Sequence, residues 1–248
     1  MSINLLRQFE TLNQYESSKG DFEYPTVSFV DENGLVYFMQ KSLYEFVDLG
    51  LPSGLKWATT NVGASKPEEF GLYFAWGETQ GYVDAFSGKG FYWGDYKFTT
   101  AATRATDAEF RGGLTKYNTK SASGTVDNLI TLELVDDAAY QSDNTCRMPT
   151  KDDFRELSGN TTIKWETLNG VNGIRFTSNT NGNSIFVPAA GKCSDGSVNG
   201  VGYCGYYWSS SLYETSPYGG WCLGFDSIVK YMGYDNRSNG RSVRAVCT

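Results

Sequence analysis

Histidine is absent from this chain of 248 residues. Its absence excludes acid–base catalysis by imidazole, nucleophiles that pair Ser or Cys with His, and metal centres that need imidazole ligands. Positive charge is also scarce, since 21 Lys and Arg stand against 28 Asp and Glu and give a net charge of −7. A surface of that sign does not neutralise phosphates, so nucleic acid is not an expected partner. We therefore expect no catalytic residue, no metal ligand and no cofactor.

Long hydrophobic runs are missing as well. No stretch approaches the roughly 20 apolar residues of a membrane helix, so membrane insertion is not expected. The first residues lack both the basic start and the apolar run of a secretory signal. The localisation stays open: cytoplasmic synthesis with incorporation into a virion, or a cell surface if a leader was removed.

The chain has only five cysteines, an odd number, and none of them form a CxxC pair. This spacing does not suit a disulfide framework and favours buried thiols. Two bridges, Cys193 to Cys204 and Cys146 to Cys247, remain open.

The first 43 residues differ from the rest of the chain in their pattern of apolar and polar residues. Apolar residues at Leu5, Phe9 and Leu12 share one helical face and predict a helix over residues 3–15. Two β-rich runs, residues 24–30 and 35–39, flank Asp-Glu-Asn-Gly and predict a hairpin. We interpret residues 1–43 as an attachment module, through which the chain could form a homo-oligomer.

From residue 44 onward, short apolar runs alternate with Gly, Asn, Ser and Asp, which is typical of short strands and long loops. Thr150 and Asp153 form a capping box that predicts a helix over residues 150–159. A second short helix is predicted over 106–113, and a helical end at 136–141. Strands are predicted at the following segments: 173–177, 184–188, 206–210 and 242–246. The pattern is α+β, mostly antiparallel.

Several segments in order resemble one known family, the Fibrobacter succinogenes major paralogous domain, related to formylglycine-generating-enzyme-like domains. The matching segments are FVDLGLPSGLKWA at 46–58, NVGA at 61–64, GLYFAWGET at 71–79, RMPT at 147–150, VPAAG at 187–191, GYYWSSS at 205–211 and GRSVRAV at 240–246. The resemblance covers residues 44–248 and implies a C-type-lectin-like fold for a ligand-binding domain. Relatives of this kind include the variable proteins of diversity-generating retroelements, whose C-terminal part is diversified. The calcium- and sugar-binding triplets of lectins and the copper-binding cysteine pair of the generating enzymes are absent.

Residues 221–234 carry the pattern that predicts a binding surface. Odd positions include Trp221, Leu223 and Phe225, which we expect in the core, and the even positions then face outward. Exposed Ile, Met and Tyr together suggest a recognition surface rich in Tyr and small polar residues. The predicted ligand-binding residues are Tyr213, Glu214, Tyr218, Gly219, Cys222, Gly224, Asp226, Ile228, Lys230, Met232, Tyr234, Asp235 and Ser238. The alternative is an ordinary hairpin covered by a loop or a neighbouring subunit.

The sequence thus favours a non-enzymatic receptor-binding protein, phage- or cell-surface-borne, whose partner is a protein or glycan on a cell surface. Two other functions stay open: an adhesin or fimbrial subunit, and a formylglycine-generating-type enzyme. Aromatic residues 206–208 are interpreted as core rather than a sugar platform. The acidic pairs Asp136-Asp137 and Asp152-Asp153 are interpreted as helix-end and surface charges rather than a calcium site.

Overall fold

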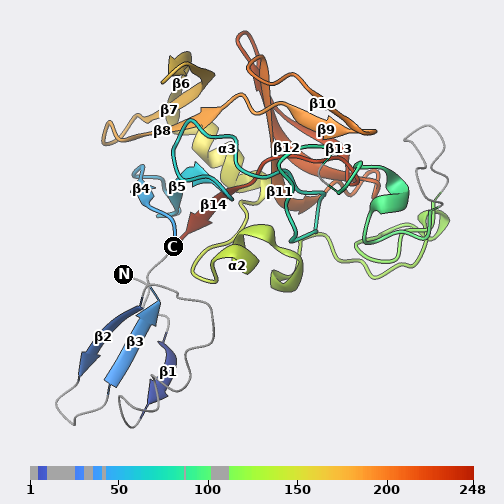
Figure 1. Cartoon of the computed structure of the whole chain (residues 1–248), viewed down its shortest axis with the longest axis horizontal. Helices are drawn as coiled ribbons and strands as arrows, with labels where there is room; N and C mark the ends of the chain where they lie inside the picture. The colour runs from blue at the N-terminus through green and yellow to red at the C-terminus, as the bar shows by residue number, and fades with distance from the viewer. Residues whose placement is uncertain (1–4, 10–25, 31–35, 41–42, 87, 102–111) are drawn as a thin grey trace.

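The computed structural model describes residues 5–9, 26–30, 36–40, 43–86, 88–101 and 112–248. Within these ranges the strands form five small sheets of two or three strands, and all strand pairs within them are antiparallel. Two α-helices and three short 3-10 helices accompany them (Figure 1). The predicted α+β class with short antiparallel strands is confirmed.

The first sheets along the chain use β1 Leu5–Phe9, β2 Thr26–Val30, β3 Val36–Gln40, β4 Phe46–Asp48 and β5 Lys56–Asn61. The helical segments are η1 Trp93–Asp95, η2 Ser121–Ser123, η3 Leu134–Asp136, α2 Ala138–Ser142 and α3 Lys151–Gly159. The later strands are β6 Thr161–Leu168, β7 Val171–Ser178, β8 Ser184–Pro188, β9 Lys192–Ser194, β10 Ser197–Asn199, β11 Cys204–Leu212, β12 Gly219–Asp226, β13 Lys230–Asn236 and β14 Arg244–Cys247. The four strand predictions in the second half of the chain are confirmed by β7, β8, β11 and β14.

The N-terminal sheet has the order β1-β3-β2. The predicted hairpin is confirmed, since β2 and β3 pair antiparallel with Val30 opposite Val36. The predicted helix is wrong at its start, because residues 5–9 form β1 and pair with β3. A helix of little more than three turns is marginal alone, whereas the free edge of β3 supplies hydrogen-bond partners for a strand. The rest of the predicted helix and the hairpin loop lie outside the described residues.

Helix α3 matches its prediction closely. The Thr150 hydroxyl accepts from the Asp153 backbone N–H at 3.1 Å, and the Asp153 carboxylate accepts from the Thr150 N–H at 2.7 Å. The helix ends at Gly159, and Phe154 and Leu157 are its buried side chains. Helix α2 lies at the predicted helical end, with Asp137 as its N-cap. The helix predicted over 106–113 falls almost wholly outside the described residues.

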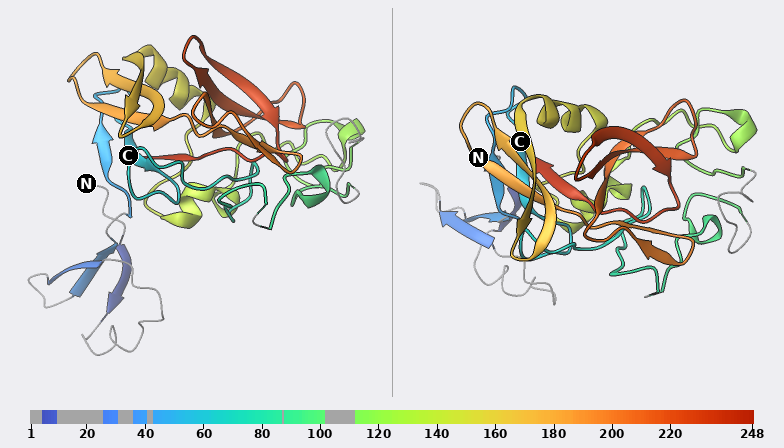
Figure 2. Two further views of the ribbon diagram at one scale, coloured as in Figure 1. Left: turned by 45° about the horizontal axis from the view of Figure 1, so that its top comes forward. Right: turned by 90° about the horizontal axis from the view of Figure 1, so that it is seen from above.

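The sheet β11-β12-β13 lies between two hydrophobic clusters. Trp208 and Cys222 belong to one cluster, whereas Tyr207 and Leu223 on the same two strands belong to the other. Helix α3 packs beside this sheet and contacts β6 on its other side, as Figure 2 shows. Strand β11 and most of β12 are therefore buried on both faces. In the described part of the chain, no helix is long and apolar enough to span a bilayer.

Candidate ligand-binding surface

The hairpin β12–β13 places the predicted site residues. It turns tightly at Asp226, whose carboxylate accepts from the backbone N–H groups of Ile228 and Val229 at 2.7 and 2.8 Å. These hydrogen bonds hold the pKa of Asp226 below its usual value. Ile228 is 90% exposed at the tip. Asp226, Ile228 and Lys230 thus belong to a hairpin tip whose turn is held by the Asp226 carboxylate and by the hydrogen bond from the Asp226 N–H to the Val229 carbonyl at 2.9 Å.

The predicted alternation of inside and outside holds only in part. Cys222 is 2% exposed and Gly224 is buried, so the expectation that both face outward is wrong. A Cβ on Gly224 would come within 2.7 Å of the Tyr231 ring, which lies across it. Leu223 and Phe225 are buried as predicted. The prediction fails for Cys222 because the hydrophobic cluster that contains Trp208 covers this face of β12, and the periodicity of a single strand does not reveal such a cover.

At the opposite end of the hairpin, three aromatic side chains come together. Tyr213 and Tyr234 stack with ring centroids 3.8 Å apart and planes inclined by 3°. Trp221 meets Tyr213 edge-on at 5.2 Å. Gly219 makes room for the stack, because a Cβ there would approach Tyr234 to 3.1 Å and Tyr213 to 3.3 Å. Tyr234 remains 57% exposed, so this cluster presents an aromatic face to solvent.

Helix α3 and the loop after β11 surround these rings with charge. The Lys151 ammonium lies 5.7 Å and the Arg155 guanidinium 5.4 Å from the Trp221 ring centroid. Lys151 also forms an ion pair with the exposed Glu214 at 3.5 Å. The cluster, here called the aromatic patch, consists of Tyr213, Trp221, Tyr234, Lys151, Arg155 and Glu214. Charged side chains around a tyrosine-rich centre are typical of protein-binding surfaces.

The remaining predicted residues play other parts. Ser238 is 1% exposed, and Gly219 is also buried, so neither faces outward as predicted. Met232 is half-buried against the second cluster. Tyr218 meets the buried Trp93 edge-on at 6.2 Å. Ser238, Met232 and Tyr218 therefore pack toward the interior of the domain, apart from the exposed tip of the hairpin.

The Asp235 side chain is held by other residues of the domain. Its carboxylate pairs with the buried Arg241 and accepts from the Asn239 amide at 2.8 Å. Burial disfavours its charged form, but the Arg241 charge and hydrogen bonds outweigh this and hold the pKa of Asp235 below its usual value. Asp235 therefore ties the end of β13 to the chain that follows, and its charge is already compensated.

The loop that carries Tyr213 and Tyr218 is held by a fully buried arginine. Arg237 donates to the carbonyls of Pro217, Tyr117 and Lys116, each at 2.9 Å. Its guanidinium also lies 4.9 Å from the Trp76 ring centroid. Five donors in a rigid fork suit this task, because each carbonyl belongs to a different residue in a different direction.

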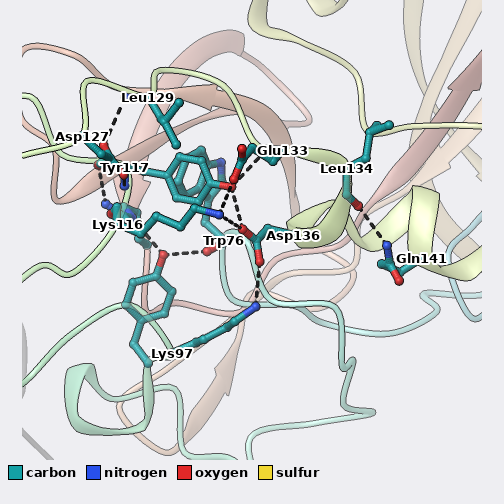
Figure 3. A network of polar contacts seen from close by, with 12 residues as sticks. Trp76, Lys97, Lys116, Tyr117, Asp127, Leu129, Glu133, Leu134, Asp136 and Gln141 are labelled. Carbon is teal, nitrogen blue, oxygen red and sulfur yellow. Dashed lines mark hydrogen bonds and ion pairs between the residues drawn. The ribbon is translucent and has the colours of Figure 1, made fainter.

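Lys116 and Tyr117 are in turn fixed by Asp136 (Figure 3). The Asp136 carboxylate accepts from Lys97 at 2.7 Å, from Lys116 at 2.6 Å and from the Tyr117 hydroxyl at 2.7 Å. The side chain of Asp136 is only 3% exposed. Asp136 ends η3, in line with the predicted helix end, but it is buried, so the prediction of a surface charge is wrong. A path of polar contacts thus runs from Asp136 through Arg237 to the loop before the aromatic patch.

The other acidic residues and the cysteines take structural places. Asp137 is buried as the cap of α2, and burial raises its pKa although three backbone N–H groups donate to its carboxylate. Among the described residues, no group of three or more His, Cys, Asp or Glu could hold a metal ion. All five cysteines are free thiols in the structure. Burial raises the pKa of Cys193 and of Cys222 to about 12.

Sequence reasoning missed Lys151 and Arg155 and assigned Trp221 to the core. Trp221 is half-buried, at the end of the sheet where the second cluster stops. One signal was available for the two cations. They are four residues apart on the helix predicted over residues 150–159, and such residues share one helical face. Nothing in the sequence, however, places that face against β12.

Comparison with known proteins gives one family match. A model described as a domain of unknown function (DUF8237) matches residues 153–246, which include α3 from Asp153 onward, the sheet β11-β12-β13 and the aromatic patch apart from Lys151. No curated protein and no solved structure matches the chain. The match therefore marks the C-terminal part of the chain as a recurring unit and assigns it no activity.

Proposed function

We propose that this chain is a non-enzymatic ligand-binding protein that engages a protein or glycan on a cell surface through the aromatic patch. The observation that carries the proposal is the stacked Tyr213–Tyr234 pair, solvent-facing and fixed by Trp221. Rigid tyrosines supply large contact area at little entropic cost, and such residues dominate the energy of many interfaces. Lys151, Arg155 and Glu214 supply the polar rim.

The scaffold is proposed to be a C-type-lectin-like domain carrying a diversifiable C-terminal surface, as the family resemblance implies. The short antiparallel sheets, the capped helix before them and the long loops support this proposal. A non-enzymatic role is supported by the cysteines. Burial raises the pKa of the Cys146, Cys193 and Cys222 thiols, which makes them poor nucleophiles.

The function is tested with fluorescently labelled full-length protein and a panel of intact bacterial strains, measured by flow cytometry. We expect saturable binding to at least one strain, weakened about ten-fold by Tyr234→Ala. Tyr203→Ala is the matched control, because Tyr203 is 79% exposed and lies outside the aromatic patch. Binding that Tyr234→Ala and Tyr213→Ala leave unchanged, or no binding to any strain, contradicts the proposal.

Diversification is tested separately in the flanking DNA. We expect a reverse-transcriptase gene and a template repeat that matches the codons for about residues 206–246 and differs at adenines. Flanking DNA without either element contradicts diversification but leaves the binding test intact.

A further inference from the structure

A pocket of about 510 Å³ lies outside the aromatic patch. Its walls come from residues 85–86 and 88–95 and from Gly196 in the turn between β9 and β10. The side chains that line it include Phe86, Lys89, Tyr92 and Asp95. Its volume lies within the range of about 300–1,000 Å³ that is typical of small-ligand sites.

Two glycines give this pocket its shape. A Cβ on Gly90 would lie 2.4 Å from the Tyr92 ring and 3.3 Å from an Asp95 carboxylate oxygen. A Cβ on Gly196 would lie 2.6 Å from the Tyr92 hydroxyl oxygen. Gly90 has no left-handed φ, so its lack of a side chain is a steric requirement rather than a backbone one. The two glycines thus let the Tyr92 ring approach the backbone of both segments closely, with the Asp95 carboxylate beside Gly90.

Hydrogen bonds to the backbone position the walls of this pocket. Tyr92 caps η1, Asp95 ends it, and the Asp95 N–H donates to the Tyr92 carbonyl at 3.0 Å. From beneath, the buried Lys89 donates to the Asp95 carbonyl at 2.6 Å. The Gly196 N–H donates to the Gly90 carbonyl at 2.7 Å and fixes the opposite wall.

The charge available to a ligand in this pocket is negative. The Lys89 ammonium is neutralised by Glu78, with contacts of 2.9 and 2.7 Å to its two carboxylate oxygens. The Asp95 carboxylate, in contrast, has neither a hydrogen bond nor an ion pair with any described residue. A ligand that donates hydrogen bonds would therefore be favoured, and an anion would be repelled.

We propose that this pocket binds a neutral saccharide, with a pyranose ring stacked on Tyr92 and its hydroxyls donating to Asp95. An aromatic face beside a carboxylate matches the two faces of a sugar, which has apolar C–H groups and polar hydroxyls. A small organic ammonium ion fits this pocket less well. Its recognition uses a cage of aromatic rings, whereas Phe86, the second ring here, is 76% exposed. The site is separate from the aromatic patch, so the proposal does not rest on the proposed function.

The test titrates the full-length chain with three neutral disaccharides, cellobiose, lactose and chitobiose, by calorimetry and ligand-observed NMR. We expect at least one to bind, and Asp95→Ala to weaken it about ten-fold or more. Asp95→Ala should leave folding intact, because no described residue depends on that carboxylate. Tyr92→Phe, which keeps the ring, should bind nearly as well as the unmodified chain, whereas Tyr92→Ala should lose binding.

The controls separate this site from the aromatic patch. Tyr234→Ala should leave saccharide binding unchanged even if it abolishes binding to cells. The proposal is overturned if no disaccharide binds up to about 10 mM, since that concentration covers even weak sites. It is equally overturned if Asp95→Ala binds as tightly as the unmodified chain, or if tetramethylammonium binds in an Asp95-dependent manner and the saccharides do not.

Discussion

Replacing Asp136 by Asn should destabilise the fold by about 2 kcal/mol. The Asn side chain has only one acceptor oxygen. If this oxygen accepts from Tyr117 and Lys116, the Lys97 ammonium loses its carboxylate partner. Lys97 is 48% exposed and returns to water at little cost. The bonds from Lys116 and Tyr117 become bonds to a neutral acceptor, at about 1 kcal/mol each. Lys116 retains Glu133 at 2.5 Å, which prevents a larger loss.

The loss of folding free energy in Asp136→Asn should depend on pH. Burial disfavours the charged form of Asp136, but the hydrogen bonds from Lys116, Lys97 and Tyr117 outweigh it, so its pKa in the fold lies below the usual value of 3.8. A depressed carboxyl pKa stabilises the fold fully above the unfolded value, and that stability is lost as pH falls through the folded value. The difference between the unmodified chain and Asp136→Asn should therefore narrow as pH falls below about 4.

Urea unfolding followed by tryptophan fluorescence, at pH 7 and at several values below 4, measures both effects. Asp152→Asn is the matched control, because the Asp152 side chain is 71% exposed and pairs only with Arg155 among the described residues. We expect the control to change stability by about 0.5 kcal/mol or less. If Asp136→Asn also stays within that range at pH 7, or if its effect is the same at all pH values, the argument from the buried carboxylate is refuted.

Two further predictions concern the scaffold. Thr150→Ala removes the hydroxyl that caps α3 and should lower the free energy of unfolding by about 1 kcal/mol, measured by urea titration, whereas Thr150→Ser should keep most of the stability. Burial raises the pKa of Cys222 to about 12, so a thiol reagent at pH 8 should not label it in the fold and should label it after denaturation; rapid native labelling would show that β12 is not packed as described.

The parts of the fold that sequence predicts well are those whose signal is local. The capping box of Thr150 and Asp153 determines where α3 begins, and both of its hydrogen bonds form within four residues. Strand β8, Ser184–Pro188, ends at a proline and was predicted at its observed bounds. The prediction for the segment that forms β1 was wrong because the structure of this segment depends on pairing with β3, about thirty residues away.

The site was predicted partly, for a related reason. Tyr213 and Tyr234 were both expected at the surface, but their stacking requires the register that sets Trp221 opposite Tyr234. The same register reverses the alternation across the turn, since Leu223 lies opposite Met232. Met232 therefore faces the core and Tyr231 the other side, where the sequence pattern expected the opposite. The length of the turn decides which face of the sheet each side chain of the next strand occupies. The hydrophobic pattern of a single strand carries no information on that length.

This arrangement limits which positions can vary in a diversified surface. Changes at Cys222 would enter a packed cluster and would cost stability, and any side chain at Gly224 would have to displace the Tyr231 ring, which is 47% exposed. Ile228 and Lys230, by contrast, are exposed at the tip, where the turn is held by the Asp226 carboxylate and not by their side chains. A repertoire built on this scaffold should therefore concentrate its variation at the two ends of the hairpin, the tip and the aromatic patch. The middle of β12, buried on both faces, should stay constant because every member needs it to fold.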